Sequence, residues 1–216
     1  MIEFKKIAPL QAFLKKNKGK SIGFVPTMGA LHEGHMALIK NAQSLCDIVI
    51  CSIFVNPKQF NKESDLVNYP NTLERDTLNL KEVNCDIVFI PSVEEIYPKN
   101  RIDKQFDFGA LATEMEGEHR PGHFNGVALV IDRFFEIINP TYAFFGEKDF
   151  QQLAIIKALV EKLNSSIKII GCPTVRETSG LAMSSRNERL IEDEKEEASA
   201  IFKALSFVAK NKKIDK

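Results

Sequence analysis

The chain has 216 residues, of which 44% are hydrophobic, enough to bury one sizeable core. Lysine plus arginine and aspartate plus glutamate each total 29, so the formal net charge is zero. This balance predicts no nucleic-acid partner and no disordered acidic chain. The N-terminus lacks a signal-peptide core and no apolar run approaches the length of a membrane span, so we expect a cytoplasmic protein with no membrane association.

The four cysteines form no C-x-x-C pair: Cys46, Cys51, Cys85 and Cys172. Three of them stand in or beside apolar runs, which predicts buried free thiols in a reducing compartment. Their spacing relative to the four histidines builds no zinc knuckle.

The first half of the chain alternates between helical and strand-like patterns. We expect a helix over 8–17, a strand over 21–25 and then a helix with Leu38, Ala42 and Leu45 on one face. A strand over 47–55, a helix over 72–83 and a strand over 85–90 follow. Pro57 and Pro91 follow the second and third strands, where a residue without an N–H ends a ladder.

The second half begins with an irregular stretch, residues 92–120, in which only 111–116 has a helical pattern. We then expect a helix over 123–138, a strand over 141–145, a helix over 149–163 and a strand over 167–171. Strands that alternate with helices predict an α/β fold with a doubly wound, Rossmann-like parallel sheet. From Pro173 the text becomes polar before a charged helix over 191–210, so we expect one domain over 1–172 and a smaller, truncated one over 173–216.

The stretch from Pro26 to Met36 joins the first strand to its helix through a glycine-punctuated turn. Such a turn presents backbone N–H groups and the positive end of a helix to an anion. Gly29 and Gly34 have the spacing of a P-loop, but His35 and Met36 follow where that loop needs Lys and Ser or Thr. The dinucleotide pattern G-x-G-x-x-G is absent from the sequence.

Residues His32-Glu33-Gly34-His35 match H-x-G-H, a pattern of enzymes that transfer a nucleotidyl group by attack on an α-phosphate. Imidazoles stabilise charge on phosphate oxygens, and Gly34 lets the backbone approach closely. Two histidines at a helix start also occur in proteins without this chemistry.

Three further polar clusters directly follow expected strands: Asn56 to Gln59, Gly146 to Asp149, and Val175 to Arg186. In an open parallel sheet the carboxyl ends of the strands gather at one edge, where ligands bind. Lys148 and Arg186 would supply cations for phosphates, and Gln59 and Gln152 neutral amides for a hydroxylated carboxylate. Taken one at a time, these residues have simpler explanations: Asp149 could serve merely as a helix cap, and the two glutamines could be surface amides.

Five segments in register carry a resemblance to a known family: Pro26–His35, Phe54–Phe60, Glu118–Phe124, Phe145–Gln152 and Met183–Asn187. From about residue 21 to 190 the chain resembles the pantothenate synthetase (pantoate–β-alanine ligase) family. The resemblance implies ATP-dependent condensation of pantoate with β-alanine through a pantoyl-adenylate, with release of AMP and pyrophosphate, in the biosynthesis of pantothenate and coenzyme A. It also implies Mg²⁺ as a cofactor and a homodimer.

The resemblance further implies roles for individual residues. The catalytic set is His35, His32, Lys148 and Arg186. The ATP-binding set is Met28, Gly29, Ala30, Leu31, His32, Glu33, Gly34, His35, Gly146, Glu147, Lys148, Asp149, Val175, Met183, Ser184, Ser185 and Arg186. Gln59 and Gln152 match pantoate-binding residues. Metal ligands stay unassigned, with Asp76 an acidic candidate only.

Two other functions stay open at this level. One is a nucleotidyltransferase that moves AMP or CMP onto a phosphate-containing acceptor, which would call for basic residues where the chain has Gln59 and Gln152. The other is a catalytically poor nucleotide-binding protein. Since members of the family usually carry a longer second domain, we expect this chain to be a short or incomplete version.

Overall fold

The computed structural model describes residues 1–211, apart from the side chain of Glu188. Residues 212–216, the end of the expected second domain, lie outside the described residues. Within the described part, six strands form one sheet in the order β1-β4-β3-β2-β5-β6. All neighbouring strands are parallel, which confirms the doubly wound α/β prediction. The strands are β1 (Ile2–Phe4), β2 (Ile22–Thr27), β3 (Ile48–Ile53), β4 (Ile87–Phe89), β5 (Tyr142–Gly146) and β6 (Lys168–Cys172).

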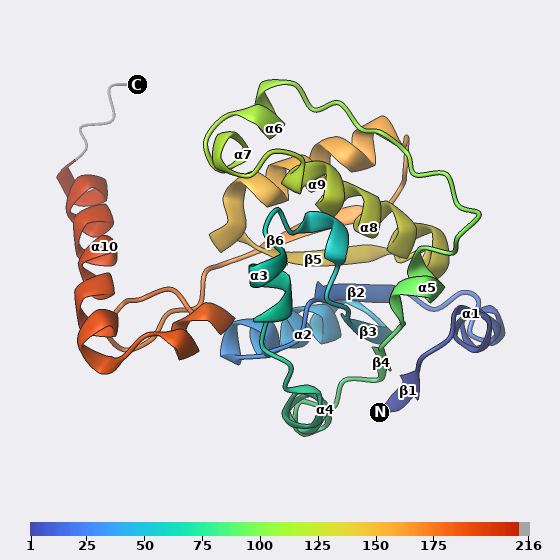
Figure 1. Ribbon diagram of the computed structural model, residues 1–216. Coiled ribbons are helices and arrows are strands. Elements are labelled where there is room, and N and C mark those ends of the chain that lie inside the picture. Colours follow the sequence, from blue (N-terminus) through green and yellow to red (C-terminus); the bar gives the residue numbers. More distant parts are fainter. Residues whose placement is uncertain (212–216) are drawn as a thin grey trace.

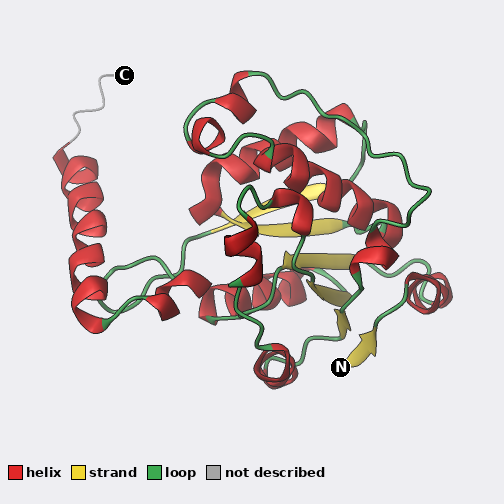
Figure 2. Cartoon of the chain, in the orientation of Figure 1, coloured by secondary structure: helices red, strands yellow, loops and turns green. Residues whose placement is uncertain are grey.

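Helices cover both faces of this sheet (Figures 1 and 2). One core cluster joins α1 (Ile7–Lys16), α8 (His123–Ile138) and α9 (Phe150–Lys162) to the strands. The second cluster joins α2 (Glu33–Leu45) and α4 (Leu73–Glu82) to the other face. Because helices cover both faces, all six residues of strand β3 are buried, and all but Ser52 are apolar.

The strand order reverses between β2 and β5, and there the two strands part. Their ladder pairs Gly23 with Tyr142 and Phe24 with Ala143. Among the described residues it pairs nothing further, although β2 runs on to Thr27 and β5 to Gly146. Pro26 suits this open side of β2 because it has no N–H to donate to a neighbour. A crevice at such a reversal is where doubly wound sheets bind ligands.

Short elements are where the sequence-based expectations were incomplete. The edge strand β1 spans three residues, too few for a periodic pattern. Four helices of one turn or slightly more were not expected as separate elements: α3 (Glu63–Val67), α5 (Val93–Ile96), α6 (Ala110–Thr113) and α7 (Glu116–His119). The first two lie in segments expected to be loops, and the last two lie where one helical piece was expected. The single helical piece expected over 111–116 is wrong, because Met115 adopts a left-handed φ of 52° that separates α6 from α7. Leu45, expected on the buried face of its helix, is 52% exposed; Met36 and Ile39 are buried instead.

After β6 the chain leaves the sheet. It forms a bridge between Arg176 and Ala182, a 3-10 turn η3 (Ser185–Arg189), and the long helix α10 (Glu192–Asn211), close to the expected 191–210. Figure 1 shows α10 standing to one side of the sheet and its helices. Phe202 of α10 packs under the Arg176 guanidinium, 4.3 Å from its carbon to the ring centroid. No helix among residues 1–211 is both long enough and apolar enough to cross a membrane.

Candidate active site

The turn after β2 is held from below by a buried carboxylate. Gly29 and Ala30 both have left-handed backbones, with φ of 83° and 50°, and this conformation is costly for alanine. Asp76 of α4, 1% exposed, compensates by accepting the N–H groups of Ala30 (2.9 Å) and Leu31 (2.8 Å). The Thr72 hydroxyl donates to the same carboxylate at 3.1 Å. Asp76 therefore supports the turn structurally, a role that the sequence did not reveal.

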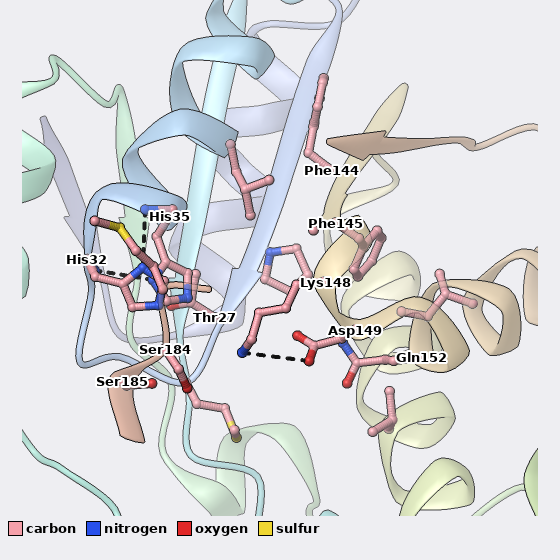
Figure 3. Close-up of a pocket in the computed structure, with 18 of the residues that line it drawn as sticks. Thr27, His32, His35, Phe144, Phe145, Lys148, Asp149, Gln152, Ser184 and Ser185 are labelled. Atoms are coloured by element: carbon pink, nitrogen blue, oxygen red, sulfur yellow. Dashed lines mark hydrogen bonds and ion pairs between the residues drawn. The ribbon is translucent and has the colours of Figure 1, made fainter. Parts of the chain in front are cut away.

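The two histidines of H-x-G-H cap the start of α2 reciprocally (Figure 3). The Gly34 N–H donates to His32 Nδ1 at 3.1 Å, and the His32 N–H donates to His35 Nδ1 at 3.3 Å. Because each Nδ1 accepts, Nε2 carries the proton in both rings. A Cβ on Gly34 would lie 2.8 Å from His32 Cε1, so glycine is needed for this arrangement. The backbone thus fixes both imidazoles as N–H donors through Nε2.

His35 is partly buried at the wall of the crevice, and its electrostatic surroundings keep it uncharged. Burial, then His32, then Lys148 lower the pKa of His35 from 6.5 to about 3. At neutral pH it is therefore a neutral hydrogen-bond donor rather than a cation.

Lys148, Asp149 and Gln152 lie across the crevice from the histidines (Figure 3). They come from η2 (Glu147–Asp149) and from the first turn of α9, directly after β5. Lys148 Nζ is 3.9 Å from Asp149 Oδ1, a long and half-exposed pair. Such a pair contributes little to stability, so the ammonium group can bind an anion in the crevice.

Gln59 lies at the inner side of the crevice, 8% exposed, at the end of the 3-10 turn η1 (Pro57–Gln59). Asn56 Nδ2 donates to Gln59 Oε1 at 3.0 Å, and Gln59 Nε2 lies 3.1 Å from the sulfur of Met28. Asn56 is itself 1% exposed and also accepts from Tyr97 Oη at 2.9 Å. Gln59 therefore presents its NH₂ group to the cavity. The sequence placed Asn56 in a polar cluster but assigned it no role.

Ser184, Ser185 and Arg186 border the crevice from the C-terminal segment, but Arg186 is already engaged. Its Nη2 donates to Asp65 of α3 at 3.0 Å, and Arg189 also approaches Asp65 at 3.6 Å. Ser185 Oγ is 3.4 Å from Tyr69 Oη. These contacts tie the segment from Ser184 to Arg189 to the 65–69 segment.

One cavity gathers most of the predicted residues. Those lining it are Met28, His32, Gly34, His35, Gln59, Gly146, Lys148, Asp149, Gln152, Val175, Met183, Ser184, Ser185 and Arg186. Five predicted ATP-binding residues do not line it: Gly29, Ala30, Leu31, Glu33 and Glu147. Unpredicted lining residues include an apolar wall from α8: Val127, Val130, Ile131 and Phe134. These have the same periodic pattern as any core helix, so sequence alone could not separate them from the core.

A doubly wound sheet with H-x-G-H at its switch point, a lysine opposite and a mixed polar and apolar cavity defines an enzyme of the nucleotidyltransferase class. A family profile described as "Pantoate-beta-alanine ligase" matches residues 3–216. The chain therefore belongs to the pantoate–β-alanine ligase family, as its motifs indicated.

Individual relatives agree. The chain is 56% identical to a pantothenate synthetase of Azobacteroides pseudotrichonymphae over 213 residues, 97% of this chain and 76% of the relative. A pantothenate synthetase structure from Thermus thermophilus superposes with a TM-score of 0.91 at 42% identity, covering 97% of this chain and 76% of that one. A Francisella tularensis ligase "complexed with Beta-gamma ATP and Beta-alanine" gives 0.90 at 43% identity, covering 95% and 79%. The chain thus spans about three quarters of the length of these relatives.

Proposed function

We propose that the crevice between β2 and β5 is the active site in which this protein carries out the reaction of its family. As a pantoate–β-alanine ligase, the protein condenses pantoate with β-alanine in an ATP-dependent reaction. One observation carries the placement: His32 and His35 are both locked as Nε2–H donors opposite Lys148, at the switch point of the sheet.

In this proposal ATP lies on the 28–35 turn, with its phosphates at the start of α2. The helix end and the two imidazoles supply N–H donors, and Lys148 supplies a full positive charge. The five predicted ATP-binding residues outside the cavity act through their backbone or support the turn. Ala30 and Leu31, for example, support it by donating their N–H groups to Asp76. Arg186 reaches the phosphates by exchanging its contact with Asp65 for a phosphate oxygen.

Pantoate lies deeper, between the amides and the apolar wall of α8. The NH₂ group of Gln59, oriented by Asn56, donates to an oxygen of the acid, and Gln152 faces the cavity from α9. Val127, Val130 and Ile131 provide a surface for the branched alkyl part.

The chemistry that fits this arrangement has two steps. A pantoate carboxylate oxygen attacks the α-phosphorus, so a P–O bond to the acyl group forms while the P–O bond to pyrophosphate breaks. The β-alanine amine then attacks the acyl carbon; the C–N bond forms, the C–O bond to AMP breaks, and the amine loses a proton. Since His35 is neutral, it stabilises charge on phosphate oxygens by hydrogen bonding and does not serve as a cation.

The residues that the structure describes do not form a binding site for Mg²⁺ by themselves. Within residues 1–211 no three His, Cys, Asp or Glu side chains gather in a way that could hold a metal ion. Both carboxylate oxygens of Asp76, the acidic candidate, already accept hydrogen bonds from the Ala30 and Leu31 N–H groups. We propose that Mg²⁺ arrives as the counterion of the ATP phosphates, in keeping with its preference for phosphate and water oxygens.

Three further properties are proposals. The segment from 173 onward is a second unit that covers the nucleotide, supported by the position of Ser184 to Arg186 on the cavity. A cytoplasmic location is supported by four free thiols. A homodimer follows only from the family resemblance, and light scattering during size-exclusion chromatography would measure it.

The decisive experiment measures AMP release with ATP and pantoate, with and without β-alanine. We expect pantoate-dependent pyrophosphate exchange without β-alanine and sustained AMP release with it. Release of pyrophosphate that requires a phosphate-containing acceptor, with the AMP group retained on that acceptor, would instead make the protein a nucleotidyltransferase of another kind. Nucleotide binding with no turnover under either condition would leave only a binding protein.

A further inference from the structure

We infer that His123 is a positioning residue for the acid substrate, because its buried imidazole holds the main chain of Gln59 in place from behind the cavity. The inference rests on the proposed role of Gln59 in binding pantoate. His123 lies in a segment that resembles the family, yet no chemistry has been assigned to it above. It is also absent from the residues that line the cavity in the described part of the chain.

The contact itself is short and enclosed. His123 is the first residue of α8 and is 5% exposed. Its Nδ1 lies 2.8 Å from the carbonyl oxygen of Gln59. A carbonyl oxygen only accepts, so Nδ1 carries the proton and donates it. Arg120 Nη2 donates to the same oxygen at 3.4 Å, which makes the imidazole the closer of the two donors.

The turn that carries Gln59 is capped at its start by Asn56, which accepts from the Lys58 N–H at 3.2 Å, but its own backbone bonds are weak. It is a 3-10 turn of three residues, and its backbone bonds from Gln59 and Phe60 are long, at 3.4 and 3.3 Å. Short 3-10 turns have poor hydrogen-bond geometry and depend on their neighbours. The position of Gln59 is therefore set from α8.

Gly126 shows how closely α8 lies against this turn. A Cβ at Gly126 would be 2.1 Å from the carbonyl oxygen of Lys58 and 2.8 Å from Gln59 Cα. The Gly126 carbonyl oxygen accepts from Asn56 Nδ2 at 3.0 Å, and the same Nδ2 orients the Gln59 side chain. His123 thus fixes the main chain of Gln59 while Asn56 fixes its amide.

Loss of the His123 contact should act on pantoate more than on ATP. The nucleotide turn rests on Asp76 and the reciprocal histidine cap, neither of which touches His123. A misplacement of about 1 Å at a substrate-binding group costs up to roughly 100-fold. The effect should appear in the KM for pantoate first.

The test replaces His123 by Asn, Gln and Leu. Asparagine can place an N–H close to the position of Nδ1, whereas the glutamine amide reaches the position of Nε2 and leucine has no donor. We expect His123→Leu and His123→Gln to raise the KM for pantoate roughly 10-fold or more, with the KM for ATP within about twofold of the parent. His123→Asn should restore most of the pantoate KM. His119→Leu, on the exposed His119 of the same segment, is the matched control and should change neither.

Equal pantoate KM values for His123→Asn and His123→Gln would overturn the inference, even if the leucine variant fails to fold. A parallel rise in both KM values would do the same, since it indicates a general structural role. Gln59→Leu is measured alongside. If Gln59→Leu raises the pantoate KM and the His123 variants do not, only the inference fails. If Gln59→Leu has no effect, the assignment of Gln59 fails as well.

Discussion

Replacing Asp76 by asparagine should damage the nucleotide turn without any involvement of a metal ion. Asparagine has one acceptor oxygen and one NH₂ group. It can accept from one of the Ala30 and Leu31 N–H groups but turns a donor toward the other. Both of these residues are buried, 2% and 3% exposed, so water does not replace the lost partner.

The expected cost follows from these bonds. One charge-assisted hydrogen bond is lost and one buried donor is left unsatisfied, which together destabilise the protein by about 2–4 kcal/mol. For a chain of this size that corresponds to a fall in melting temperature of about 5–15 °C. Ala30 then loses the contact that holds its left-handed backbone, so nucleotide affinity should fall as well.

The assay compares AMP binding in EDTA with ATP binding in Mg²⁺, alongside thermal unfolding. We expect Asp76→Asn to weaken both kinds of binding. Glu74→Gln removes an exposed charge from the same helix and should alter neither binding nor stability. Normal AMP binding in EDTA, with a loss confined to Mg²⁺-dependent ATP binding, would refute this reasoning and show that the carboxylate acts through the metal.

Three other predictions concern the histidine cap and the C-terminal segment. His35→Ala should lower adenylate formation by roughly 10²–10³-fold while ATP affinity changes far less, and near-native turnover in pre-steady-state assays would exclude its role. His35 stays neutral in the folded protein down to about pH 3, whereas the unfolded chain takes up a proton near pH 6.5, so its contribution to stability is present above pH 6.5 and is lost as the pH falls. Urea unfolding at several pH values should show a shallower loss for His35→Gln. By hydrogen exchange, residues 178–186 should exchange faster than the strands without ATP and become protected with it, and Asp65→Asn should speed their exchange in the free protein; equal protection in both states would make the segment a static linker.

The sequence by itself determined the layout of the molecule. Alternating strand and helix patterns predicted five of the six strands. They could do so because the buried apolar residues of a strand or helix recur along neighbouring positions with a period of 2 or 3.6. The H-x-G-H stretch and the three other polar clusters that follow strands predicted which residues meet, since parallel strands bring their carboxyl ends to one edge. The short elements β1 and α3 carry too few positions for a period and were missed, whereas the equally short β4 lies within the apolar run 85–90 and was predicted.

Only the tertiary structure decided how the site residues are held and charged. The Asp76 carboxylate meets the Leu31 N–H across 45 positions, and His123 meets the Gln59 carbonyl across 64. Which nitrogen of His35 carries the proton depends on one backbone N–H, and its neutral state depends on burial and on Lys148 across the crevice. Arg186 is paired with Asp65, 121 positions away. These outcomes rest on distances of about 3 Å between residues remote in sequence, and on the loss of water around them, and no local pattern of residues encodes either quantity.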